Sequence, residues 1–442
     1  MTTYTHFSIF DNIILVENKE KNTDLSQFNK TILPNGIKVI SETISYVKSF
    51  SLGFWFNVGS RDEIDQNNGI THFIEHMLFK GTKKRSAKKI AVDIESFGGY
   101  LNAFTSKEHT CYYGRGLENH IEKTFDVLSD MIQQPAFKPA EIKKESSVVI
   151  DELYDIEDNP EELIFDKFEE NIFAGNSLSM PIIGSEENLK NFSQRNLLNF
   201  VKEKYGFNRL VIAASGAVNH EKLLKFADKY IKTDLGISNI KRKNYSPNNS
   251  IVKLEIIDKE IQQVHAIIGR AAYGYKNEKR TIANVLSQIL GEGSSSRLFQ
   301  TVREKNGIAY QINSFLNSFY DISTFGVYFS TNEKMMHKAI SIILKEFKKL
   351  RETKISDREL NKAKESIKSG LLLSLEGTSN RMMRMAQSEL YFNRIKSIDE
   401  AIKDIDSVTR ENILEAANEL LEEETFIKLI IKSKNTIIKT AA

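Results

Sequence analysis

Apolar residues recur along the chain with helical and strand periods, in two series that follow the same order. The first series predicts two strands (36–43 and 50–58), an amphipathic helix (69–79), a strand pair starting at Gly99, two helices (121–133 and 139–157) and a strand (210–215). The second series predicts two strands (251–257 and 263–270), a helix (279–290), two strands (307–314 and 322–330) and helices starting at Glu333 and Ser356. The repeat predicts an α+β fold of two homologous α/β halves, each a mainly antiparallel sheet packed with helices.

A polar segment separates the two series. Residues 232–250 contain few bulky apolar side chains and include the Ser-Pro-Asn-Asn sequence of a loop. We therefore predict an N-terminal domain at 1–235, a linker at 236–249 and a C-terminal domain at 250–442. A chain of 442 residues with 40% hydrophobic content is long and apolar enough to build two cores.

The predicted helix at 69–79 contains the sequence His72-Phe73-Ile74-Glu75-His76, an H-x-x-E-H pattern known as the inverzincin zinc signature. His72 and His76 are one turn apart, so both imidazoles project from one face and can bind one metal ion. Glu75 can reach an attacking water without binding the metal, which is the position of a general base. Histidine pairs also occur as structural residues, but a chain with 8 histidines would contain this pattern by accident only about 0.01 times.

The third ligand is predicted in the acid-rich helix at 139–157. Glu145 and Glu152 are two turns apart and share a face, whereas Asp151 is rotated away from it. The spacing favours Glu152 but does not separate it from its acidic neighbours. A solvated acidic surface is the alternative interpretation of this helix.

Together these residues resemble the M16 (pitrilysin-type) zinc metallopeptidases, and within them the two-domain processing peptidases, over nearly the whole chain. The resemblance implies that Glu152, 76 residues after His76, is the third ligand of one zinc ion per chain. It implies that Glu145, seven residues earlier, orients a ligating histidine or the water. It also implies a clamshell of two halves that encloses a peptide substrate.

Three further segments match the same family. The sequence 98–106 resembles its glycine-led edge strand, so Asn102, Ala103, Phe104 and Thr105 would bind an extended peptide through the main chain, although an ordinary hairpin strand has the same pattern. Arg303 and Tyr310 match its R-x6-Y element, which stabilises the developing oxyanion.

Glu162 and Asp166 match the acidic pair that binds a substrate arginine in the presequence-processing branch. The pair implies basic or presequence-like substrates. Two carboxylates on a solvated helix are the alternative.

The metal is predicted in the first half alone. Matching the two series places Gly370 at the position of Glu152, and the segment 290–296, which replaces the metal helix, contains no histidine. The second half is therefore predicted to hold substrate. A non-catalytic scaffold subunit of the same fold is the rival function, but such relatives typically lose zinc-site residues, and all four are present here.

Composition narrows the remaining classes of partner and cellular compartment. A net charge of +2 gives no electrostatic argument for nucleic-acid or membrane binding. No apolar stretch has the length of a membrane span, and the first thirty residues lack the pattern of a signal peptide. The single cysteine, Cys111, excludes an intrachain disulfide and favours a reducing compartment. We expect a bacterial cytoplasmic protein, and a homodimer because two-domain relatives usually pair.

Overall fold

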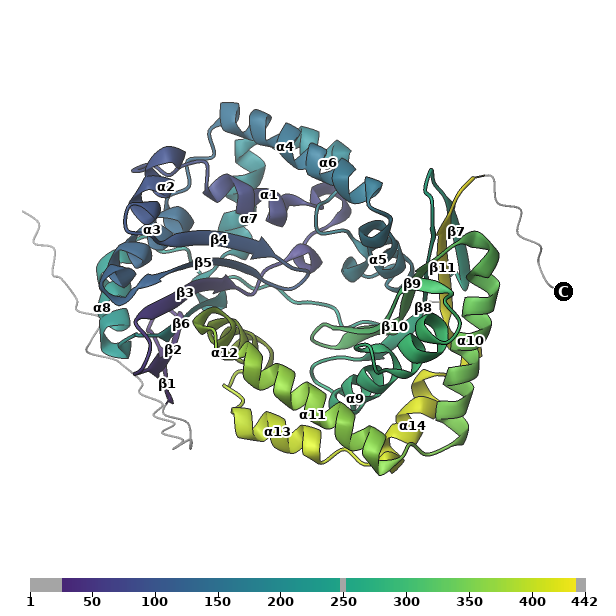
Figure 1. Cartoon of the computed structure of the whole chain (residues 1–442). Helices are drawn as coiled ribbons and strands as arrows, with labels where there is room; N and C mark the ends of the chain where they lie inside the picture. The colour runs from purple at the N-terminus through teal and green to yellow at the C-terminus, as the bar shows by residue number, and fades with distance from the viewer. Residues whose placement is uncertain (1–25, 247–251, 435–442) are drawn as a thin grey trace, which may run out of the picture. The chain divides into compact units, whose positions relative to one another are not determined.

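The computed structural model describes residues 26–246 and 252–434 and divides into two compact units (Figure 1). Of the described residues, the first unit comprises those up to Asp151, residues 180–242 and residues 374–395. The second comprises residues 152–179, the described residues between 243 and 373, and those from Lys396. The first division falls inside one continuous helix, α4 (Pro139–Asp158).

Six strands form the sheet of the first unit, in the order β1-β2-β6-β3-β5-β4. They are β1 (Ser26–Ile32), β2 (Lys38–Ile44), β3 (Ser49–Phe56), β4 (Tyr100–Thr105), β5 (Thr110–Leu117) and β6 (Leu210–Gly216). The β2 and β6 strands run parallel, and the other neighbours run antiparallel. The β4 strand therefore lies at one edge of the sheet.

Five strands form the sheet of the second unit, in the order β7-β11-β8-β10-β9. They are β7 (Leu254–Asp258), β8 (Val264–Tyr273), β9 (Ala309–Ser318), β10 (Ile322–Thr331) and β11 (Ile427–Lys432). The first sheet without β1 has this same order, and in both sheets the one parallel pair occupies the same place. The predicted fold of two homologous halves is confirmed. The first residue of the strand predicted at 251–257 lies outside the described residues.

Helices cover both sheets. The first unit contains α1 (Ile70–Leu78), α2 (Ala87–Glu95), α3 (Ile121–Gln133), most of α4, α6 (Glu186–Asn191), α7 (Gln194–Lys204), α8 (His220–Tyr230) and α12 (Thr378–Phe392). The second contains α5 (Pro160–Ile172), α9 (Lys279–Gly291), α10 (Glu333–Glu352), α11 (Asp357–Ser374), α13 (Ile398–Asp406) and α14 (Arg410–Leu420). Among the described residues, none of the helices combines the length and the apolar character that crossing a bilayer requires.

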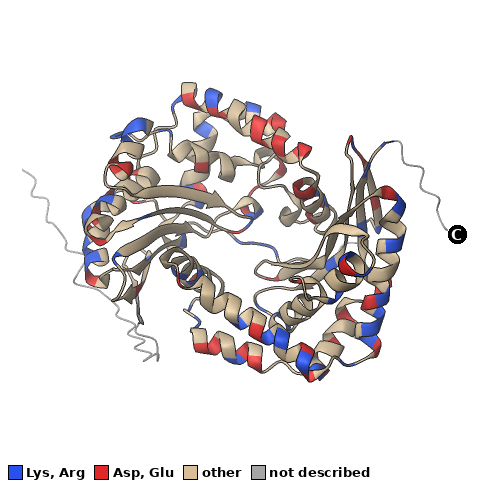
Figure 2. Cartoon of the chain, viewed as in Figure 1, with Lys and Arg blue, Asp and Glu red and all other residues tan. Residues whose placement is uncertain are grey.

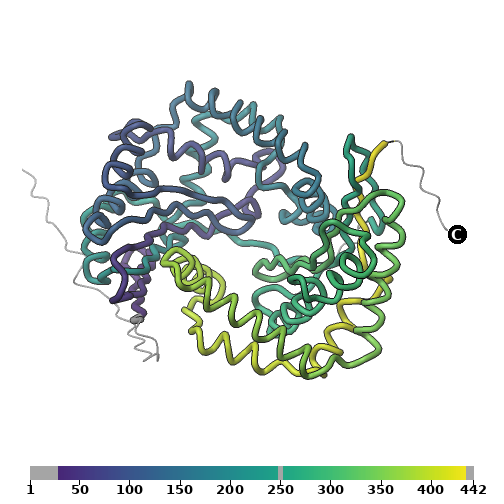
Figure 3. The backbone as a smooth tube through the Cα atoms, viewed as in Figure 1, coloured from purple at the N-terminus to yellow at the C-terminus, as the bar shows by residue number. Residues whose placement is uncertain are grey.

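One helix of each sequence half packs on the sheet of the other half. The α12 helix returns to the first unit, where the tube trace shows its segment beside the first sheet (Figure 3). Its residues Met382 and Met385 are buried in one cluster with Trp55 and Val211. The Trp55 indole Nε1 donates a hydrogen bond to the Met382 sulfur at 3.2 Å.

The exchange is reciprocal, because α5 belongs to the core of the second unit. Its residues Ile164 and Phe168 are buried with Ile267 of β8 and Leu429 of β11. The compact units thus differ from the domains predicted at 1–235 and 250–442 by these exchanged segments. The linker predicted at 236–249 remains a prediction.

Replacing Met382 with Ala should lower the free energy of unfolding by about 2–5 kcal/mol, because the change opens a cavity in a fully buried site. Urea unfolding of the purified protein measures this loss. Leu198→Ala in α7 of the same unit is the control, since Leu198 is 46% exposed. Equal losses for the two variants would contradict the packing of α12 on the first sheet.

Candidate metal centre

Helix α1 places two histidines side by side. Its N-cap residue is Gly69, whose φ of +95° is in the left-handed region and where a Cβ atom would lie 2.6 Å from a backbone oxygen. Phe73 and Met77 are fully buried and fix one face of the helix in the core. His72 and His76 lie on a less buried side, with ring centroids 4.6 Å apart.

The α4 helix brings Glu152 to these histidines. One ligand atom from each of His72, His76 and Glu152 lies within 4.8 Å of the other two. Asp151 is exposed and does not belong to this group. The rest of the described chain, including the described residues of the second sequence half, contains no other such group of three.

The acidic surface that the sequence offered as an alternative is also present. The ribbon of Figure 2 is red, the colour of Asp and Glu, at several positions in the second half of α4 and on α5. Asp155, Glu157 and Asp158 belong to it and are exposed. Glu152 is only partly exposed and lies on the side of α4 that the histidines occupy.

The protonation state of His72 suits a metal ion. Burial, and then the neighbouring His76, lower the pKa of His72 to about 3, so His72 is neutral at pH 7 and carries the lone pair that a ligand needs. Two imidazoles and one carboxylate form the nitrogen and oxygen set that zinc prefers in catalytic sites. These residues fit a zinc ion.

Glu145 orients one of the histidines. Its Oε1 atom lies 2.9 Å from Nδ1 of His76, and its Oε2 atom accepts a hydrogen bond from Lys80 at 2.6 Å. Burial tends to raise the pKa of Glu145, but the bonds from His76 and Lys80 outweigh it, so the pKa is lowered and the carboxylate is ionised. An ionised Glu145 accepts from Nδ1–H of His76 and leaves Nε2 as the metal-binding atom.

Glu75 lies next to the ligand set without belonging to it. Its side chain is buried, and its Oε2 atom accepts a hydrogen bond from Thr105 Oγ1 at 2.6 Å. Thr105 is the last residue of β4, so the edge strand contacts the predicted base directly. The arrangement holds the carboxylate of Glu75 in a defined position beside the histidines.

The predicted peptide-binding strand is an edge strand. Asn102, Ala103, Phe104 and Thr105 all lie on β4, which pairs with β5 on one side. On the other side the sheet ends, within the part of the chain that the structure describes, so main-chain groups of β4 are open to an added strand. The α1 helix packs against β4, as Figure 1 shows.

The other predicted site residues lie in the second unit, as two local pairs. The Arg303 guanidinium lies 5.8 Å from the ring centroid of Tyr310, whose side chain is 74% exposed. Glu162 and Asp166 are one turn apart on α5, and Glu162 accepts a hydrogen bond from Asn159 at 2.7 Å. Their roles at the substrate stay predictions.

Sequence reasoning missed two residues around α1. Lys80 is four residues after His76, so helical periodicity alone would have placed it on the same face. Glu63 lies in the loop before α1, and its carboxylate accepts hydrogen bonds from the first backbone amides of that helix. No periodic signal marks a residue in such a loop.

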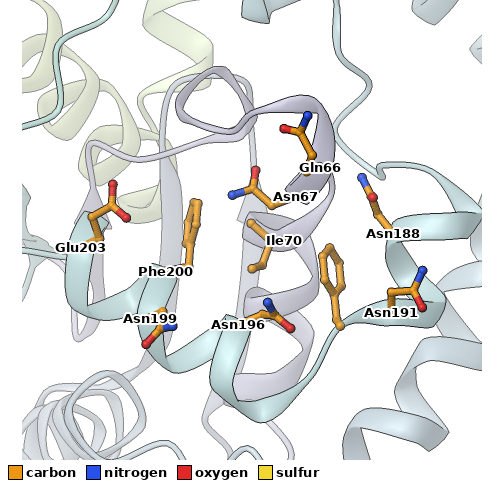
Figure 4. A pocket seen from close by; sticks show the side chains of 10 residues that line it. Gln66, Asn67, Ile70, Asn188, Asn191, Asn196, Asn199, Phe200 and Glu203 are labelled. Atoms are coloured by element: carbon orange, nitrogen blue, oxygen red, sulfur yellow. The ribbon is translucent and has the colours of Figure 1, made fainter.

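A separate pocket of about 290 Å³ lies beside the start of α1 (Figure 4). It is lined by Ile70, Phe192, Phe200, Glu203 and six side-chain amides, those of Gln66, Asn67, Asn188, Asn191, Asn196 and Asn199. None of the metal-site residues lines it. The candidate site is therefore the group of His72, His76 and Glu152 and not this pocket.

Comparison with known proteins identifies the family. Residues 38–186 match the family described as Insulinase (Peptidase family M16), and residues 191–367 match the Peptidase M16 inactive domain. An uncharacterised zinc protease of Bacillus subtilis is 34% identical over 91% of this chain and 97% of its own length. Another, from Streptomyces coelicolor, is 33% identical over 89% of this chain and 87% of its own.

The chain belongs to the M16 peptidase family. The resemblance to the M16 family found in the sequence is thereby confirmed. Two solved structures have the same fold as this M16 chain. One is a protease from Helicobacter pylori, with a TM-score of 0.84 and 22% identity over 92% of this chain and all of that one. The other is a peptidase M16 inactive domain from Pseudomonas fluorescens, with a TM-score of 0.86 and 16% identity over 94% of this chain and all of that one.

Metal analysis tests the ligand set. The purified protein should contain about one zinc ion per chain, and Glu152→Ala should lose most of it on dialysis, because two histidines alone bind weakly. Inductively coupled plasma mass spectrometry measures the metal content. Asp151→Ala is the matched control on the adjacent residue and should keep its zinc; loss of zinc from both variants alike would contradict the assignment of Glu152.

Proposed function

We propose that this M16 chain is a zinc-dependent endopeptidase that hydrolyses extended peptides. The observation that carries the proposal is the convergence of His72, His76 and Glu152, with the carboxylate of Glu75 beside them. A three-ligand site of nitrogen and oxygen atoms leaves a position open for chemistry, unlike a closed structural zinc site. The presence of all four residues in one place disfavours a scaffold role.

Each residue has a distinct task in the proposed hydrolysis. A zinc ion held by His72, His76 and Glu152 would polarise the scissile carbonyl and acidify the attacking water. Glu75 takes the proton of that water and returns it to the leaving amine. Thr105 fixes the Glu75 carboxylate through its hydrogen bond to Oε2.

The substrate binds as an added strand on β4 in this proposal. Extended peptides pair with the main chain of an edge strand, so binding depends little on substrate sequence. Residues 102–105 then lie along the peptide, and Thr105 joins that strand to Glu75. In the second half, Arg303 and Tyr310 donate hydrogen bonds to the carbonyl oxygen as negative charge develops.

Replacing Glu75 with Gln should leave the zinc content intact and lower kcat by a factor of about 10²–10⁴, because a general base makes a contribution of this size. Cleavage of a fluorogenic peptide, with and without a chelator, measures the loss. Asp151→Asn is the control that changes a nearby exposed carboxylate. A wild-type protein that binds zinc but cleaves none of a broad peptide panel would support the scaffold function instead.

Substrate preference is the second part of the proposal. Glu162 and Asp166 bind a basic side chain of the substrate, which gives a preference for arginine-containing, presequence-like peptides. Carboxylates one turn apart on a helix can together bind one guanidinium group.

Reversing both charges, Glu162→Lys with Asp166→Lys, should lower kcat/KM for arginine-containing peptides at least about tenfold more than for neutral ones. Parallel assays on matched peptide pairs measure the ratio. Glu170→Lys, an exposed position on the same helix, is the control for net charge. Equal losses on both peptides would remove the proposed arginine site.

The proposal includes a homodimer in the bacterial cytoplasm. It also includes a substrate-holding role for the second sequence half, residues 250–442, whose described residues form no metal group. Sedimentation of the purified chain tests the assembly.

A further inference from the structure

The first turn of α1 lacks a cap from its own N-terminal residue. A helix begins with backbone N–H groups that have no partner within the helix, and a Ser, Asp or Asn side chain usually accepts from them. At α1 this position is Gly69, which has no side chain. His72 lies in this first turn, three residues after Gly69.

Glu63 takes over this capping role from outside the helix. Its Oε2 atom accepts from the amide of Gly69 at 2.8 Å, and its Oε1 atom accepts from the amide of Thr71 at 2.8 Å. The Asn68 side chain donates a third hydrogen bond to Oε2 at 2.9 Å. A negative charge here also interacts favourably with the positive end of the helix dipole.

The loop that contains Glu63 is itself tightly held. The adjacent Asp62 binds Arg242 through both carboxylate oxygens, at 2.9 and 2.6 Å. The preceding Arg61 forms a buried ion pair with Glu108 at 2.6 Å. These ion pairs therefore hold Glu63 in one position at the start of α1.

This position is a costly one for a carboxylate. The side chain is 4% exposed, and burial raises the pKa of Glu63 to about 7, against the bonds from Thr71, Gly69 and Asn68 that lower it. A short exposed cap would serve helix stability at a lower cost. Buried carboxyl groups with a strongly shifted pKa are typical of functional sites.

We infer that Glu63 is a positioning residue for the metal centre: its carboxylate closes the first turn of α1 and thereby fixes the backbone that carries His72. Glu145 orients His76 through its ring, and Glu63 acts on His72 through the main chain. The inference rests on the proposed zinc site. It adds a residue that neither binds the metal nor touches substrate.

Zinc affinity of Glu63→Gln, measured by competition with a chromophoric chelator, tests the inference. The variant keeps the size of the side chain but directs an NH₂ group at one of the two backbone amides. Zinc affinity should fall about tenfold, and the visible spectrum of the cobalt-substituted protein should change, because both report on ligand placement.

Glu42→Gln is the matched control. Glu42 is another buried carboxylate of the first unit, which accepts hydrogen bonds from Arg381 at 2.6 Å and Ser215 at 3.0 Å. Like Glu63→Gln, this variant should lose thermal stability, but its zinc affinity and cobalt spectrum should be unchanged. Wild-type metal binding in Glu63→Gln, or equal weakening in both variants, overturns the inference.

The outcomes separate this inference from the proposed function. If the wild-type protein takes up no zinc, both are overturned; if it binds zinc and Glu63→Gln binds it equally well, the positioning role alone is overturned. If Glu63→Gln does not fold, amide hydrogen exchange of the wild-type protein decides. Protection of the Gly69 and Thr71 amides equal to that of the helix interior supports the cap, and exchange at unprotected rates overturns it.

Discussion

The placement of α1 against α4 is the constraint on which the candidate site depends. His72 and His76 share a helix, but Glu152 lies 76 residues further along the chain and reaches them only if the two helices keep their positions. The buried residues of α1 hold that helix in the core of the first unit, and Glu145 of α4 links the two helices through His76. Because Glu145 is buried, a lost partner would leave an uncompensated charge, which makes this link strongly specific.

Buried charges around the start of α1 extend the same principle. The Arg61–Glu108 and Arg242–Asp62 pairs hold one loop in one conformation. Such pairs contribute little net stability, since the desolvation of two charges offsets most of their attraction. They do penalise every conformation that separates them, and a metal site needs this kind of rigidity more than additional stability.

The two halves show how one topology serves with and without a metal group. The sheets share their strand order, and α11 takes the place of α4 in the second unit. There Arg297, just after α9, forms a two-pronged ion pair with Glu359 of α11, at 2.7 and 2.9 Å. A direct ion pair thus joins elements that in the first half converge on the histidines and Glu152. Because α5 and α12 are exchanged, neither sheet is covered only by helices of its own sequence half.

The sequence by itself determined the features that arise from local geometry. Helical periodicity put His72 and His76 on one face, and α3 occupies the residues predicted for it, 121–133, because backbone hydrogen bonds and side-chain alternation act over a few residues. Resemblance to a family added Glu152 and Glu145, which spacing had left among several acids.

Only the tertiary structure placed α12 on the first sheet and brought Glu63 to the start of α1. Each of these is a contact between segments that are distant in sequence or joined by an irregular loop. Their free energy depends on packing and desolvation in the folded chain, and no local pattern of residues encodes it.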